Sequence, residues 1–226
     1  MLSKTTAQIY NYGTTRKVNL EVIIKMAVRL KTRWHRSKRS DRNRKGSNKE
    51  KSLDDLSGVV AFNIWKLAKE TFLHMEKENF RFREDTQAID VVSELCIFML
   101  HIVDRMIYDN VPEEQRAPLV NGIAMDLAKS VETNQLELLG PDDPSGKYMG
   151  VFIEKLNDRL SNYAECGFDE EGPAYDFKRY LAQNISEIMS VSDNKWVVEQ
   201  IIDVEAPGLI ERFQPVVRDV LGVRKK

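Results

Sequence analysis

Five polar residues in the largely apolar stretch between residues 86 and 109 could carry chemistry. They are Glu94, His101, Asp104, Arg105 and Tyr108. In a helix, four of them lie along one side, because His101, Arg105 and Tyr108 follow Glu94 by 7, 11 and 14 residues. A titratable histidine beside carboxylates, with an arginine that can bind an anion, is typical of a functional pocket. The spacing therefore predicts a pocket on this helix.

The same residues have a second interpretation. Polar groups inside an apolar helix need partners, because burying them unpaired is costly. An internal ion-pair network with one satisfied core histidine would meet that need, and it is the commoner outcome for a single histidine on such a helix. Both interpretations stay open on the sequence alone.

No motif in the chain points to a metal or a cofactor, and we expect neither. A di-iron bundle needs Glu-x-x-His pairs on two helices. The chain has Glu70-x-x-x-His74 and His101-x-x-Asp104 instead. The stretch GPDDPSGK (140–147) fails the phosphate-loop spacing, and no nucleotide fingerprint or nucleophile motif is present. An enzyme therefore has no specific support.

The charges divide the chain into two parts. Residues 1–51 carry 15 Lys+Arg against 3 Asp+Glu, a net charge of +12, and residues 52–226 carry a net charge of −13. Within the first part, residues 17–36 fit a basic amphipathic helix. Residues 37–52 contain no apolar side chain, which is typical of a disordered linker. We expect a basic N-terminal arm (1–51) and an acidic folded domain (53–226).

The arm has three interpretations. It can dock on a protein partner or an anionic membrane surface, it can neutralise nucleic-acid phosphates, or it can simply be solvated. The acidic domain would repel a polyanion, which disfavours nucleic acid. The candidate contact residues are Lys25, Arg29, Arg33, Trp34, Arg36, Lys38, Arg39, Arg42, Arg44 and Lys45.

The rest of the chain shows helical periodicity throughout. Apolar residues recur at helical spacing in 54–79, 86–109, about 112–132, 148–164, 174–190, 194–205 and 209–222. Pro118 and Gly122 are expected to kink or split the third helix, and Ala206-Pro207-Gly208 to separate the last two. Residues 86–109 are apolar on nearly every side, as in a central helix. The prediction is an all-α bundle of about six to eight helices.

Compartment and membrane signals are few. The two cysteines, Cys96 and Cys166, are too few for a disulfide framework, which favours a reducing compartment and the cytoplasm. The N-terminus lacks acids before Glu21, so organelle import through a transit segment is a second possibility. The most apolar run, residues 95–103, has about half the length of a membrane-spanning helix, so no span is expected.

The leading hypothesis is a non-enzymatic helical protein that works by binding, with its basic arm docked on a protein partner or an anionic surface. The first alternative is a bundle enzyme or ligand or metal carrier that uses the pocket on helix 86–109. The second alternative is salt-sensitive binding of nucleic acid through the arm.

Overall fold

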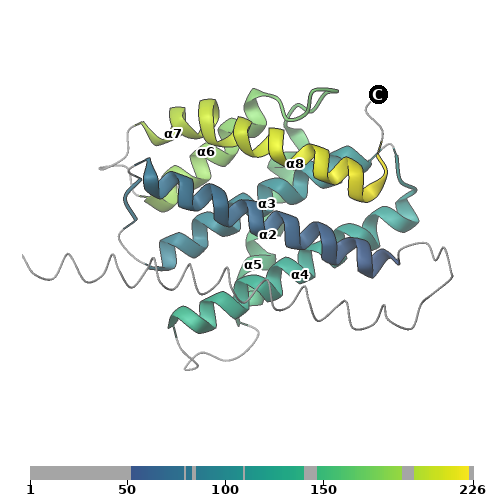
Figure 1. Ribbon diagram of the computed structural model, residues 1–226, viewed down its shortest axis with the longest axis horizontal. Coiled ribbons are helices and arrows are strands. Elements are labelled where there is room, and N and C mark those ends of the chain that lie inside the picture. Colours follow the sequence, from purple (N-terminus) through teal and green to yellow (C-terminus); the bar gives the residue numbers. More distant parts are fainter. Residues whose placement is uncertain are drawn as a thin grey trace, which may run out of the picture. The chain divides into compact units, whose positions relative to one another are not determined.

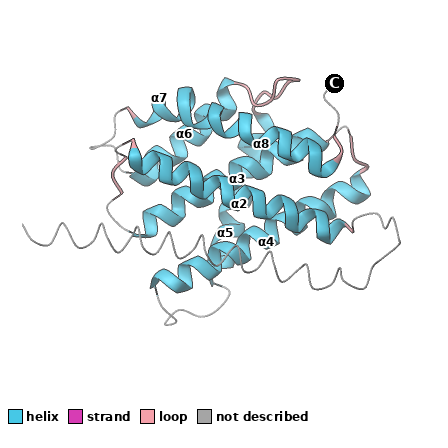
Figure 2. Cartoon of the chain, viewed as in Figure 1, coloured by secondary structure: helices cyan, strands magenta, loops and turns pink. Residues whose placement is uncertain are grey.

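The computed structural model describes residues 52–78, 80–82, 85–108, 110–139, 147–189 and 196–223. These residues form an all-α bundle without strands, as the periodicity predicts (Figures 1 and 2). The helices are α2 (Leu53–Lys77), α3 (Asp85–Ile107), α4 (Glu113–Leu139), α5 (Lys147–Glu165), α6 (Tyr175–Met189), α7 (Val197–Gln200), the π-helix η2 (Ile201–Glu205) and α8 (Ala206–Leu221).

The basic arm lies outside the described residues. The predicted helix 17–36 and all ten candidate contact residues of the arm therefore stay predictions. The last residue assigned to the linker, Ser52, belongs instead to the folded domain, where it caps α2. Its hydroxyl accepts a hydrogen bond from the backbone N–H of Asp55 at 3.1 Å. Asp54 and Asp55 in the first turn add negative charge where the helix dipole is positive.

The helix α3 is the centre of the bundle. Every residue from Val91 to Val103 is buried, and α3 packs against α2, α4, α5 and α6. By length and composition, Thr86–Ile107 could cross a membrane, whereas the sequence analysis considered only the shorter run 95–103. However, 78% of its most apolar window is buried inside the bundle. A core helix passes the same test, so this length carries no evidence for a membrane span.

The helix α4 continues through Pro118 and Gly122, which were expected to interrupt it, and ends at Leu139 rather than near Glu132. Pro118 lies in the second turn of α4. Because proline has no N–H, it leaves the carbonyl of Glu114, four residues back, without its usual helical hydrogen bond. Glu114 is exposed, so solvent can reach this carbonyl. Gly122 faces α2. A Cβ atom there would lie 3.0 Å from Cβ and Oγ of Ser57. The glycine thus permits close packing of α4 on α2.

The segment Val197–Leu221 forms one continuous helical path, so Ala206-Pro207-Gly208 does not separate two helices. The π-helix η2 explains this outcome. The N–H of Ala206 donates to the carbonyl of Ile201, five residues back. In a regular α-helix, a proline has no N–H to donate and its ring clashes with the carbonyl four residues back. The wider π-turn accommodates Pro207. Figure 1 shows this path alongside α2, which α8 contacts.

Two glycines test the close packing of α4 on α2: Gly122 lies at the contact, and Gly208 in α8 lies away from it. We expect Gly122→Val to lower the free energy of unfolding by about 1–3 kcal/mol, because its side chain meets Ser57. Gly208→Ala should raise it by about 0.5–1 kcal/mol, because no atom lies within 4 Å of the added Cβ and alanine favours the helix. Urea unfolding of the full chain measures both values. Equal effects of the two substitutions would contradict the close contact at Gly122.

Candidate functional site

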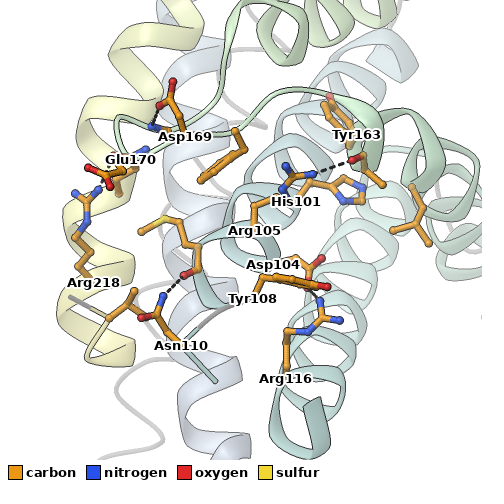
Figure 3. Close-up of a pocket in the computed structure, with 17 residues that line it drawn as sticks. His101, Asp104, Arg105, Tyr108, Asn110, Arg116, Tyr163, Asp169, Glu170 and Arg218 are labelled. Atoms are coloured by element: carbon orange, nitrogen blue, oxygen red, sulfur yellow. Dashed lines mark hydrogen bonds and ion pairs between the residues drawn. The ribbon is translucent and has the colours of Figure 1, made fainter. Parts of the chain in front are cut away.

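A cavity of about 710 Å³ lies at one end of the bundle (Figure 3). Its walls come from the C-terminal half of α3, the start of α4, the end of α5, the α5–α6 loop (166–174) and the end of α8. Several wall residues reach the surface, among them Tyr108, which is 63% exposed, and Leu160, which is 51% exposed. The cavity is therefore open to solvent and large enough for a small organic ligand.

Four of the five residues proposed for a pocket on helix 86–109 line this cavity. They are His101, Asp104, Arg105 and Tyr108. Glu94 does not. It lies seven residues before His101, about 10 Å along the helix axis, in the enclosed middle of α3. Glu94, the first residue of the predicted set, is thus outside the cavity.

Glu94 forms a buried ion pair with Arg159 of α5. Arg159 donates from Nη2 to Oε1 of Glu94 at 3.0 Å, and the Glu94 side chain is 1% exposed. Burial raises the pKa of Glu94, while the guanidinium of Arg159 opposes that rise. This pair is the internal network that the second interpretation of the sequence described, and it ties α5 to α3.

Asp104 is also paired, but at the cavity wall. Arg116 of α4 forms an ion pair with Asp104 and a second one with Glu113 at 2.7 Å. The same guanidinium lies over the Tyr108 ring, 4.9 Å from its centroid. The charge of Asp104 is therefore neutralised, and its carboxylate is held by Arg116 rather than by His101.

His101 is buried and stacks on Tyr163 of α5. The ring centroids are 4.7 Å apart, the planes differ by 31°, and His101 is 6% exposed. Burial lowers the pKa of His101 to about 4, so the imidazole is neutral at pH 7. Its Nε2 has no hydrogen-bond partner among the described residues, and neither has the Tyr163 hydroxyl. No carboxylate of the described residues orients this histidine as a general base.

Arg105 has no acidic partner in the described part of the chain. Its Nη1 donates to the backbone carbonyl of Ala164 at 2.8 Å, and its guanidinium lies 5.7 Å from the centroid of the Phe168 ring. No carboxylate among the described residues lies within 4.0 Å of it. On the opposite wall, Arg218 donates to Oε1 of Gln214 at 3.0 Å and has no ion pair in the described part of the chain.

The α5–α6 loop is fixed against α8. The Asp169 carboxylate accepts hydrogen bonds from the N–H groups of Glu171 and Gly172, at 2.8 and 3.1 Å. The Gln214 amide donates to the Glu171 carbonyl at 3.3 Å. Gly172 has φ of 121°, and a Cβ atom there would lie 2.0 Å from Nε2 of Gln214. These contacts hold the α5–α6 loop in place, and Phe168 of this loop lines the cavity.

The sequence analysis missed several wall residues: Arg116, Tyr163, Phe168, Gln214 and Arg218. They come from four other segments, and no spacing relates them to helix 86–109. In the structure Asp169 is occupied by backbone N–H groups, and no group of three His, Cys, Asp or Glu among the described residues is placed to hold a metal.

The arrangement suits binding rather than covalent chemistry. Cys96 is buried in α3, away from the cavity, and burial raises its pKa. The pKa of Cys166 is raised too, by burial and by nearby acids such as Asp176. Neither thiol is thereby activated as a nucleophile. Comparison with known proteins adds no analogy, because no family, no curated protein and no solved structure matches the chain.

The low pKa of His101 makes stability depend on pH. The folded pKa is about 4 and the ordinary value is 6.5, so the unfolded chain binds this proton more tightly. The stabilisation is complete above the ordinary value and is lost as pH falls toward the folded one. Wild type should lose about 2–3 kcal/mol more than His101→Gln between about pH 7.5 and about pH 4.5 in urea unfolding.

Met99→Leu is the control for this measurement, because it changes a buried residue of the same helix without removing a titratable group, and it should leave the wild-type pH dependence in place. Parallel pH profiles for wild type and His101→Gln would contradict the assignment.

Proposed function

We propose that the helical domain is a non-enzymatic binding protein that takes a small organic ligand in the cavity between α3, the α5–α6 loop and α8. The observation that carries this proposal is the cavity itself. It has about 710 Å³ of space, and Arg105 and Arg218 on its walls lack acidic partners among the described residues. The walls combine charged and polar side chains with apolar ones such as Phe168, Leu160 and Met106, and in ligand sites such polar groups fix the orientation of the ligand.

The alternative of an enzyme has less support from the geometry. A general base needs a proton-accepting group whose pKa lies near the working pH. His101 is neutral with a pKa of about 4, and Asp104 is engaged by Arg116. Arg105 and Arg218 can orient or bind a ligand but cannot remove a proton at neutral pH.

A substitution at the rim of the cavity tests this proposal. Leu160→Trp should fill part of the cavity without disturbing the core, because Leu160 is half exposed. A screen of neutral, anionic and cationic fragments by ligand-observed NMR on the full chain should give ligands whose affinity falls at least about tenfold in this variant.

The matched control is Val151→Trp, on the same helix and 45% exposed, but not part of the cavity wall. It should bind the same fragments as wild type does. If no fragment distinguishes Leu160→Trp from Val151→Trp, the cavity is not a binding site.

The charge asymmetry favours a second proposal, in which the basic arm (1–51) docks the protein on a protein partner or an anionic membrane surface. The net charge of +12 against −13 supports it, and so does the amphipathic pattern of residues 17–36. The acidic domain again makes nucleic acid the less favoured target. The cytoplasm is the proposed location, with organelle import through the N-terminal segment as the alternative.

Removing the arm tests this second proposal. Proteins or lipids that the full chain recovers from host lysate at low salt should be lost from a chain that begins at Ser52, because the arm supplies the contact. Raising the salt should weaken recovery by the full chain, since exposed charges are screened. Recovery that is the same with and without the arm would contradict docking through it. Recovery of nucleic acid with a steep salt dependence would favour the less preferred target.

A further inference from the structure

The chemistry of the ligand follows from the surroundings of Arg105. A guanidinium carries five N–H donors and stays protonated at any physiological pH. Among the described residues, one hydrogen bond of Arg105 is made, from Nη1 to the Ala164 carbonyl. The remaining donors have no protein acceptor there. A partly buried guanidinium without a counter-ion is poorly stabilised unless an anion or water completes its coordination.

The nearby carboxylates do not supply that counter-ion. Asp104 is taken by Arg116, and Asp169 accepts two backbone N–H groups of its own loop. Glu170 is exposed, and in Figure 3 it lies beside Arg218 on the wall opposite Arg105. Asp104 and Asp169 thus already have partners, and Glu170 lies across the cavity from Arg105. Arg105 is therefore left without a carboxylate beside it among the described residues.

Apolar groups surround this charge. The guanidinium lies near the ring of Phe168, and Leu160, Ala164 and Met106 contribute to the same cavity. A simple inorganic anion would leave these surfaces exposed to water. An anion with an apolar, ring-containing body would cover them and gain the corresponding hydrophobic free energy.

We infer that the cavity binds an amphipathic organic anion, whose single acidic group pairs with Arg105 while its apolar body lies against Phe168, Leu160 and Met106. The inference rests on the proposed function and adds the chemical class of the ligand. Arg105 is the specificity-determining residue, because the planar fork of its N–H groups matches a carboxylate or a related oxyanion.

Two fluorescent probes of nearly equal shape test the inference. The anion 8-anilino-1-naphthalenesulfonate and the neutral N-phenyl-1-naphthylamine share one ring body and differ in the acidic group. Both are titrated into the full chain, into Arg105→Gln, and into Arg212→Gln. Arg212 is the matched control, because it lies on α8 outside the cavity and pairs with Glu70 of α2.

The anionic probe should bind Arg105→Gln about 10- to 100-fold more weakly than wild type, which is the usual effect of losing hydrogen bonds to a charged group. The neutral probe should bind all three proteins within about twofold, because the apolar walls are intact. Arg212→Gln should match wild type for both probes. The basic arm is the same in every protein, so any probe that it binds contributes equally.

A second comparison in wild type covers the case in which Arg105→Gln does not fold, because Arg105 also holds the Ala164 carbonyl. Here 1-naphthoate should displace the anionic probe at least about tenfold better than the neutral 1-naphthamide. This preference should disappear in Leu160→Trp and persist in Val151→Trp.

The outcomes separate this inference from the proposed function. Equal binding of the anionic and neutral probes, both lost in Leu160→Trp, would overturn the inference and keep a ligand site. An anionic preference that survives in Arg105→Gln or in Leu160→Trp would overturn it as well, because the anion would then bind elsewhere. Binding of neither probe in any protein would overturn the inference, and the fragment screen would still decide the proposed function.

Discussion

The enclosure of α3 is the constraint on which the rest of the described structure depends. Every residue of this helix from Val91 to Val103 is buried, because α2, α4, α5 and α6 surround it. Burial of a continuous apolar surface supplies most of the free energy that holds such a bundle together. It also dictates the state of every polar group on the helix, which must be paired, neutral or placed at an end.

The polar groups of α3 show all three solutions. Glu94, in the middle, is ionised only at a cost and therefore pairs with Arg159. His101, one turn before the enclosure ends, stays neutral and stacks on Tyr163. Arg105 lies beyond the enclosure, where the cavity begins, and keeps its charge without an acidic partner in the described residues. The place of each group along the helix thus decides whether it is structural or available for binding.

The cavity itself depends on two local departures from regular structure. The π-turn of η2 lets the chain pass Pro207 and continue as α8, which brings Gln214 and Arg218 to the cavity. Gly172, with its positive φ, lets the α5–α6 loop approach Gln214 closely. Regular helices alone would leave the end of α3 without this wall. The acids and arginines that meet there are consequently far apart in the sequence.

The sequence by itself determined the local properties of the protein. Periodicity was enough to predict the all-α class, the central place of α3, and a common side for His101, Arg105 and Tyr108, because the helix repeat fixes which residues share a face. It failed at Pro118 and at Ala206-Pro207-Gly208, where an exposed carbonyl and a π-turn removed the steric penalty that normally ends a helix.

Only the tertiary structure decided which charges meet. Glu94 and Arg159 are 65 residues apart, and the spacing of one helix says nothing about which acid lies opposite. Asp104 met Arg116 of the following helix, so the predicted proximity of acid and histidine had no consequence for His101. The cavity is likewise a product of how separate segments pack. Its position could be expected from α3, but its walls and its unpaired guanidinium depend on contacts that arise only when the chain has folded.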